Sequence, residues 1–225
     1  MVTYEEVLAR LTAHQDTKYA AFHSKLLKNE NIQLIGVRIP VLRSLAKEWK
    51  GEVDTFLTFP DTYYEITLLK CALVGMLKYE EFVKRVDRVV PLLDNWATCD
   101  TFTAPCVKKH RQEFLPYIKR YLKSDEEFTV RYGLVMLLHY YVEEEYLALI
   151  FDSVRALTKK DYYIMMGAAW LIAEVLVKFY DAGVGFLQEG SMPKEMHNKA
   201  IQKAQESLRM SSEQKAFLKS LRKEK

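Results

Sequence analysis

The sequence predicts an all-α protein built from paired helices. Only 8 Gly and 6 Pro occur among 225 residues, so the chain has few of the breakers that a many-turned β protein needs. Apolar residues recur at helical spacing along most of the chain. Signals for helix starts recur every 30 to 36 residues, the period of paired-helix solenoids, at Asp61, Asn95, Asp125 and Asp161. An irregular helical bundle is the alternative, because no strict consensus repeats along with these starts.

The composition is that of a globular protein with a sizeable core. Hydrophobic residues make up 49% of the chain and charged residues 28%, and we expect a single domain over residues 1–225. The formal net charge of +3 permits a nucleic-acid partner without demanding one. No stretch approaches the roughly 18 consecutive apolar residues of a membrane span, and the N-terminus lacks the pattern of a signal peptide. We therefore expect a soluble, cytoplasmic protein without a membrane partner.

The cysteines and histidines show no metal-binding pattern. Cys71, Cys99 and Cys106 are odd in number and contain no Cys-x-x-Cys pair, which argues against a disulfide framework and against a structural zinc site. The five histidines are scattered without ligand spacing, and no Gly-rich phosphate loop occurs. We expect neither a metal nor an organic cofactor.

The first part of the chain predicts amphipathic helices. Residues 4–28 suit one or two helices with a break within 12–17, and residues 29–31 are expected to form a loop. Pro40 stands where a proline is tolerated, in the first turn of the next helix, and Gly36 gives that helix a flexible approach. Arg43 and Lys47 are four residues apart on this helix, so two positive charges project from one side.

The same alternation of helices continues to the end of the chain. We expect the next helices over residues 53–59, 63–78, 80–93, 96–109, 111–123, 126–141, 144–157 and 161–179. The glycine-containing segment 181–185 is expected to break the last long helix. The tail from 192 to 225 is expected to form two terminal helices, divided near residues 210–212, that cap an open solenoid end.

An aromatic residue and a carboxylate stand four residues apart just after a helix-start signal. Asn95 can cap the helix by accepting a hydrogen bond from one of its first N–H groups. Trp96 and Asp100 then share one helical face near the helix start, where a carboxylate stays ionised. A core tryptophan with a dipole-compensating aspartate is the alternative reading of this spacing.

Residues near corresponding starts of successive inner helices lie side by side in a helix-pair solenoid. The predicted pairing of helices therefore places Arg131, Tyr163 and Trp170 in the same groove as Trp96 and Asp100. The five residues together are a more specific indication of a functional site than Trp96 and Asp100 alone.

Two members of this set also have structural readings. Arg131 lies on an otherwise apolar helix face, where an ion pair with Glu126 or Glu127 would equally account for it. Trp170 lies in an apolar segment where a core role is the default for an indole.

Further cations could contact a nucleic-acid backbone. Lys108, Lys109 and Arg111 belong to a basic run at a helix junction, which is either a solvated loop or a phosphate contact. Lys199 and Lys203 are four apart in a terminal helix and could touch phosphate in the same way.

Four blocks of the sequence, in order and at fitting intervals, carry a family resemblance. They are Ile35-Gly36-Val37-Arg38-Ile39-Pro40-Val41-Leu42-Arg43, Asn95-Trp96-Ala97-Thr98-Cys99-Asp100, Val130-Arg131-Tyr132-Gly133 and Gly167-Ala168-Ala169-Trp170. With these blocks the chain resembles the AlkD-type DNA alkylation repair glycosylases over most of its length. The resemblance implies a right-handed superhelical solenoid of HEAT-like antiparallel helix pairs.

The resemblance also implies an activity and its residues. Members of this family bind duplex DNA on a basic concave face and remove cationic N3- and N7-alkylated purines. Asp100 would be the catalytic aspartate, Trp96 and Trp170 the aromatic residues beside it, and Arg131 the arginine on the DNA backbone. The partner would be double-stranded DNA, alkylated or branched, and the protein a monomer that needs no cofactor.

The sequence departs from the family pattern at several positions. Ala173 stands where active relatives usually carry an arginine, and Asn95 where another aromatic is common. Tyr132 and Tyr163 are bulky where smaller residues would leave room for a lesion. These departures keep open a non-catalytic binder of duplex or branched DNA. The small net charge keeps open a helical-repeat protein-interaction module.

Overall fold

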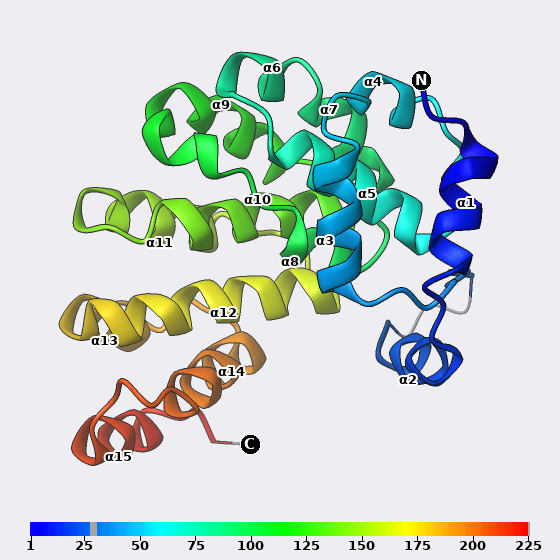
Figure 1. The fold of residues 1–225 in the computed structure, drawn as a ribbon. Helices are drawn as coiled ribbons and strands as arrows, with labels where there is room; N and C mark the ends of the chain where they lie inside the picture. The colour runs from blue at the N-terminus through cyan, green and yellow to red at the C-terminus, as the bar shows by residue number, and fades with distance from the viewer. Residues whose placement is uncertain (28–30, 225) are drawn as a thin grey trace. The chain divides into compact units, whose positions relative to one another are not determined.

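The computed structural model describes residues 1–27 and 31–224, which form only helices with the turns and loops between them. The predicted all-α class is therefore confirmed. The chain divides into two compact units, Met1–His110 and Arg111–Lys225 (Figure 1). The single domain over residues 1–225 stays a prediction. Of the loop predicted at 29–31, residues 29 and 30 lie outside the described residues.

Unit 1 is organised around α5. Its helices are α1 (Tyr4–Thr12), α2 (Thr17–Leu27), α3 (Ile39–Glu48), α4 (Val53–Phe56), α5 (Tyr64–Gly75), α6 (Tyr79–Val83), α7 (Val86–Val89), η1 (Val90–Leu92), α8 (Trp96–Thr101) and η2 (Pro105–Lys109). Every residue of α5 except Ala72 is buried, including the polar residues Glu65, Thr67 and Lys70. It packs against α3, α4, α7 and α8.

A buried lysine holds the segment that precedes α5. Lys70, only 1% exposed, donates from Nζ to the carbonyl of Phe59 at 2.7 Å and to Oδ2 of Asp61 at 2.8 Å. Thr67 donates to the other carboxylate oxygen of Asp61 at 3.1 Å. Asp61 therefore bonds to side chains of α5, and the N-cap residue of this helix is Tyr63, which makes no side-chain cap hydrogen bond.

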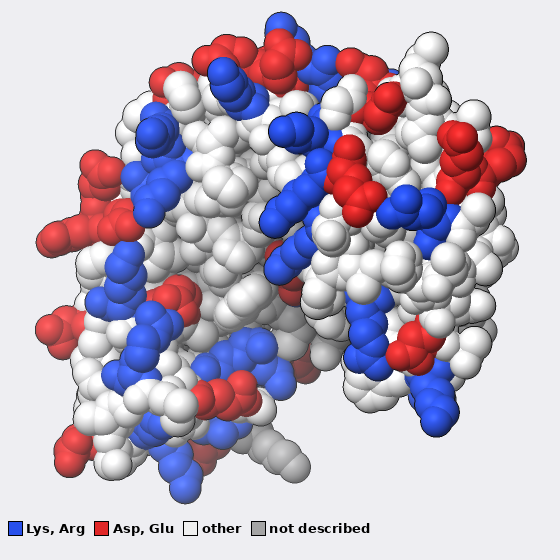
Figure 2. Space-filling model, viewed as in Figure 1, with Lys and Arg blue, Asp and Glu red and all other residues white. Residues whose placement is uncertain are grey.

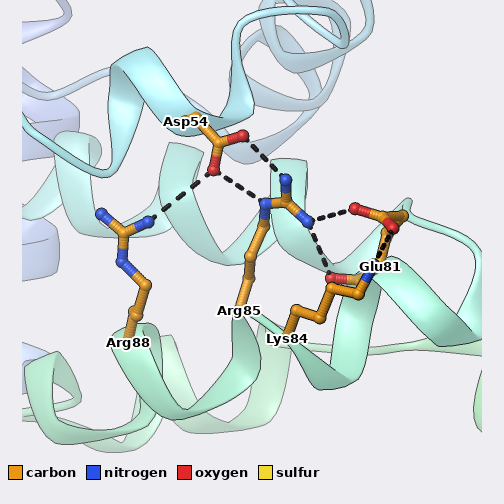
Figure 3. A network of polar contacts seen from close by, with 5 residues as sticks. All are labelled: Asp54, Glu81, Lys84, Arg85 and Arg88. Atoms are coloured by element: carbon orange, nitrogen blue, oxygen red, sulfur yellow. Dashed lines mark hydrogen bonds and ion pairs between the residues drawn. The ribbon is translucent and has the colours of Figure 1, made fainter.

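An ion-pair network ties α4 to the α6–α7 segment (Figure 3). Arg85 donates from Nε and Nη2 to both carboxylate oxygens of Asp54, at 2.8 and 2.7 Å, and from Nη1 to Glu81. Lys84 and Arg88 extend the network at its two ends. The Arg85 guanidinium lowers the pKa of Asp54. Because the Asp54 side chain is 63% exposed, its pair with Arg85 stabilises the fold by at most about 1 kcal/mol.

Unit 2 has the layered packing of a helix-pair solenoid. Its helices are α9 (Arg111–Tyr121), α10 (Glu127–Tyr140), η3 (Glu144–Tyr146), α11 (Leu147–Arg155), α12 (Tyr162–Lys178), α13 (Tyr180–Gln188), α14 (Lys194–Gln205) and α15 (Ser212–Ser220). The long apolar helix α12 packs between α10 and α14 (Figure 1). Each of these three helices also packs against a neighbour in the chain, namely α9, α13 and α15.

Hydrogen bonds between successive layers of unit 2 repeat at a near-constant sequence separation. Gln112 bonds to Tyr146 at a separation of 34, Arg155 to Glu189 at 34, and Arg209 to Glu174 at 35. Lys178 bonds to the carbonyl of Val142 at a separation of 36. These values match the predicted period of 30 to 36 residues, so the described residues of unit 2 form a paired-helix solenoid rather than an irregular bundle.

Two of the predicted helices are interrupted. The helix expected over 96–109 ends at Thr101, where Phe102 leaves the helical conformation with φ −74° and ψ 79°. Pro105 keeps the chain from returning to this helix, because it lacks an N–H group and disfavours the helical conformation at Ala104, which has φ −133° and ψ 83°. The helix expected over 80–93 is divided at Arg85, with φ −121°. The guanidinium of Arg85 bonds to Asp54 in the ion-pair network.

The break predicted at 181–185 is also wrong. Helix α13 runs through this segment, and the chain turns at Phe179, with φ −132° and ψ 66°. Gly183 is needed for packing, because a Cβ there would lie 2.8 Å from Cδ2 of Leu176. The division of the tail into two helices near residues 210–212 is confirmed, with Ser211 capping α15. Among the described residues, none of the helices combines the length and the apolar character needed to cross a membrane.

Candidate active site and nucleic-acid interface

The start of α8 is held by the predicted cap. Asn95 is 1% exposed, and its Oδ1 accepts from the backbone N–H of Thr98 at 3.0 Å. Its Nδ2 donates to Oδ1 of Asp94 at 2.7 Å. Both ends of the cap side chain are thus satisfied, which fixes the first turn of α8 and the direction in which Trp96 leaves it.

Trp96 is anchored by a helix far away in the sequence. Its indole Nε1 donates to the carbonyl of Leu26, at the end of α2, at 3.2 Å. The imidazole of His23 meets the ring at 6.5 Å between centroids and an interplanar angle of 61°. Trp96 is half-buried, so one part of its ring is held by α2 while another remains accessible.

Asp100 follows one helical turn after Trp96. The spacing of four residues puts both side chains on the same side of α8, as predicted, and Asp100 is half-buried. The next residue, Thr101, donates back to the carbonyl of Ala97 at 2.6 Å and closes the short helix. A carboxylate with partial access to solvent therefore lies beside an anchored indole.

Asp94 is a second carboxylate near Trp96 that sequence reasoning missed. Burial of its carboxyl group raises the pKa of Asp94, although the hydrogen bond from Asn95 opposes this effect. The residue as a whole is exposed, but Oδ1 of its carboxyl group accepts a hydrogen bond from the buried side chain of Asn95. The only local signal was an acidic residue directly before the cap, which is common at helix starts.

His23 links Trp96 to the core. Its Nε2 shares a hydrogen bond of 3.1 Å with Oη of Tyr64, and its ring stacks on Tyr19 at 5.2 Å. Burial lowers the pKa of His23, and the nearby charge of Glu65 opposes this lowering with a smaller effect. The folded state therefore favours the neutral imidazole.

We expect the protein to lose stability in mild acid, in part through His23. Because its pKa is lower in the folded state than in the unfolded chain, the stability it contributes is complete above the ordinary histidine pKa of about 6.5. That contribution disappears as the pH falls through the lower, folded-state pKa. Thermal unfolding followed by circular dichroism between pH 7.5 and 5 should show a smaller pH dependence for His23→Gln than for wild type. The exposed His14→Gln is the control, and an unchanged dependence in His23→Gln would contradict the assignment.

Arg131 in unit 2 is almost fully buried, at 5% exposure. Its Nη1 donates to the carbonyl of Tyr163 at 2.8 Å, and Oε1 of Glu127 accepts from the N–H of the same tyrosine at 2.8 Å. Gly167 of α12 lies against Arg131, since a Cβ there would be in van der Waals contact with the arginine side chain at 3.6 Å. Arg131 and Glu127 together hold the first turn of α12, so the buried arginine has at least a structural role.

Trp170 is half-buried on α12 beside His139. The two rings meet edge to face, with centroids 6.3 Å apart and an interplanar angle of 82°. One turn later, both carboxylate oxygens of Glu174 accept from Nη2 of Arg209, at 2.9 and 2.8 Å. Ala173, which directly precedes Glu174, is buried and carries no charge.

Comparison with family models settles the membership of the chain. Residues 7–208 match the model of the DNA alkylation repair enzymes. The chain belongs to this family. No curated protein matches it. As a member of a DNA alkylation repair family, the protein has a role in the repair of alkylated DNA and a DNA partner.

Within this repair protein, the cations predicted to contact DNA differ in their surroundings. Arg43, Lys47, Lys108 and Lys109 are exposed in unit 1, and Lys and Arg side chains gather along α3 in Figure 2. Nε of Arg111 instead donates to the carbonyl of Tyr140, so this guanidinium is engaged within its own unit.

The two cations predicted on α14 are half-buried. Lys199 donates to Oε1 of Gln202 at 3.0 Å, and Lys203 lies one turn further along the helix. All these phosphate contacts stay predictions. Among the described residues, no three His, Cys, Asp or Glu side chains are grouped as metal ligands.

The two bulky tyrosines of the sequence differ in exposure. Tyr132 was expected to crowd the groove, but it is 0% exposed and packs against Tyr121 in the core, with centroids 5.8 Å apart. Tyr163 is half-buried and packs on Phe128. Of these two tyrosines of the repair protein, Tyr163 lies near the surface and Tyr132 does not.

Proposed function

We propose that the protein is a DNA glycosylase that releases cationic N3- and N7-alkylated purines from duplex DNA. Membership of the DNA alkylation repair family supports a repair role. The observation that carries the finer proposal is the pairing on α8 of a half-buried carboxylate, Asp100, with an indole held by Leu26, Trp96. Both residue types suit a reaction in which positive charge must be stabilised.

The chemistry requires little beyond this pair. Alkylation at N3 or N7 makes the purine a cationic leaving group, so positive charge develops on the deoxyribose as the N9–C1′ bond breaks. The carboxylate of Asp100 stabilises that charge and orients a water molecule toward C1′. A C1′–O bond forms, the water loses a proton to Asp100 and then to solvent, and the purine departs as a neutral base.

Aromatic residues and cations complete the proposed mechanism. The indole of Trp96 attracts the cationic base and sugar through its electron-rich face. Trp170 and Arg131 are proposed for the roles that the family resemblance implies, a second aromatic surface and a phosphate contact. Exposed lysines and arginines bind the phosphates without regard to sequence, and binding should weaken steeply with salt.

A base-release assay tests the activity directly. Under single-turnover conditions, wild-type protein should release 7-methylguanine or 3-methyladenine from methylated duplex DNA, because both lesions leave as neutral bases. The same duplex without methylation is the control and should release nothing. If methylated DNA is bound but no base is released, the glycosylase proposal is wrong.

A non-catalytic binder of duplex or branched DNA is the second candidate. The observation that favours it is Ala173, which is buried and leaves the surface beside Trp170 without a cation from α12. This candidate predicts salt-sensitive DNA binding with no loss of base from any substrate.

A further inference from the structure

A cavity in unit 1 has no role in the proposed mechanism. It has a volume of about 440 Å³, within the range of small-molecule sites. It lies between α3, the end of α5 and the segment after α8. Its lining residues are Arg43, Ala46, Lys47, Ala72, Gly75, Met76, Leu77, Thr101, Thr103, Pro105 and Cys106.

The shape of the cavity depends on a close contact between two backbones. The end of α5 packs directly on the segment after α8, since a Cβ on Gly75 would lie only 2.1 Å from the carbonyl oxygen of Thr103. Pro105 stops α8 from continuing and directs this segment across the end of α5. Small side chains at Ala46 and Ala72 leave the remaining space open.

The lining is apolar with positive charge at one side. Arg43 and Lys47 are one helical turn apart on α3 and both are exposed, so their charged groups reach solvent at the cavity. No carboxylate is among the lining residues of this cavity. The floor and walls are mainly alkyl, thioether and thiol groups. The ligand that fits this lining has an apolar, polarisable body and an anionic group at one end.

A nucleotide has this combination, with a flat base joined to a phosphate. Thr101, which lines the cavity, directly follows Asp100 in the chain. The proposed reaction site at Asp100 and the cavity therefore share the short helix α8. A fully paired base could not enter the cavity. The base of an unpaired nucleotide could enter the cavity.

We propose that this cavity binds an unpaired nucleotide of DNA, with the base inside and its phosphate on Arg43 and Lys47. The proposal rests on the DNA binding that the proposed function includes. It adds a preference for DNA with an unpaired nucleotide, such as a single-nucleotide bulge, over fully paired DNA of the same sequence.

The cavity contains its own reporter, Cys106. Cys71 and Cys99 are 1% and 0% exposed, whereas Cys106 is half-buried and accessible from the cavity. A thiol reagent should therefore modify native protein at Cys106. Burial raises the pKa of Cys106, so the pH must be identical in every arm of the experiment.

The first test compares the rate of Cys106 modification in the presence of three probes at saturating concentration. A duplex with a single-nucleotide bulge should slow the modification about tenfold, as expected for a thiol covered by a bound base. The matching fully paired duplex should leave the rate nearly unchanged. Equal rates with the two duplexes would overturn the proposal. Equal protection by free deoxyadenosine monophosphate would assign the cavity to free nucleotides and also overturn it.

The second test removes the two cations. The double variant Arg43→Gln/Lys47→Gln should lose the preference for bulged over paired DNA, measured as the ratio of dissociation constants by fluorescence anisotropy. The control is Lys18→Gln/Lys25→Gln, which removes two exposed charges from α2, outside the cavity lining, and should keep the ratio. Both pairs are exposed, and circular dichroism melting checks that each variant folds. A preference that persists without Arg43 and Lys47 contradicts the proposal.

The results of the two cavity tests can be distinguished from the result of the base-release assay. Protein that releases no methylated base but protects Cys106 with bulged DNA supports the cavity and removes the catalytic proposal. Protein that releases the base from paired duplex without a preference for bulged DNA supports catalysis and removes the cavity proposal.

Discussion

Asp100→Asn should reduce the single-turnover release of 7-methylguanine from duplex DNA by about 10²- to 10³-fold, the usual effect of removing one group that stabilises transition-state charge. Asparagine keeps the size of the side chain and loses the negative charge. It can neither stabilise the cationic sugar nor take the proton of the attacking water. The affinity for unmodified duplex should change little, because Asp100 is not one of the cations that hold the phosphates.

The matched control for this prediction is Asp87→Asn. Asp87 is an exposed aspartate on α7 in the same unit, and the substitution makes the same change in net charge. Base release should stay close to wild type in this variant, and melting temperatures should show that both variants fold. Release by Asp100→Asn at the wild-type rate would remove Asp100 from the mechanism. An equal loss in both variants would mean that net charge, rather than Asp100, is responsible.

Glu65→Ala should cause a large loss of stability, on the order of 3–5 kcal/mol, because it removes a buried charge-assisted acceptor. Glu65 is 0% exposed on α5. Its Oε1 accepts from the N–H groups of Gly36 and Val37 at 2.7 and 3.1 Å, and its Oε2 from that of Ile35 at 3.0 Å. Without the carboxylate, three backbone donors next to α3 lose their acceptor.

The melting temperature of Glu65→Ala should fall because of this loss of stability. For a chain of this size, the expected fall is roughly 10 °C. Glu65→Gln should be affected less, since its single amide oxygen can still accept. The control is Glu48→Ala, which breaks an exposed pair with Arg10 and should cost less than about 1 kcal/mol. If Glu65→Ala melts as Glu48→Ala does, the loop before α3 is held by something other than this carboxylate.

The loop before α3 also shows how far sequence reasoning reaches. The sequence predicts that Gly36 gives the helix a flexible approach. In the structure it has φ +98°, and a Cβ there would lie 2.6 Å from the carbonyl oxygen of Asp16. Its positive φ brings three successive N–H groups toward Glu65. Nothing in the local sequence connects residues 35–37 with Glu65, because the contact spans 28 to 30 positions.

The candidate site was predictable in part for the same reason. The cap at Asn95 and the shared face of Trp96 and Asp100 depend on interactions within one helical turn, and both could be derived from residue types and spacing. The bond from Trp96 to Leu26 spans 70 positions and could not. The burial of Arg131 and of Tyr132 likewise depends on the helices packed around α10, and the residues next to them in the sequence do not predict it.

By itself, the sequence determined the all-α class, the repeat period, the cap of α8 and the family resemblance. These follow from short-range signals: helical periodicity, capping residues, few breakers and ordered sequence blocks. Only the tertiary structure decided that Gly183 serves packing in α13 and that a cavity forms beside α3. Each of these depends on which backbones approach closely. That is decided by the packing of residues far apart in the sequence, where local propensity gives no information.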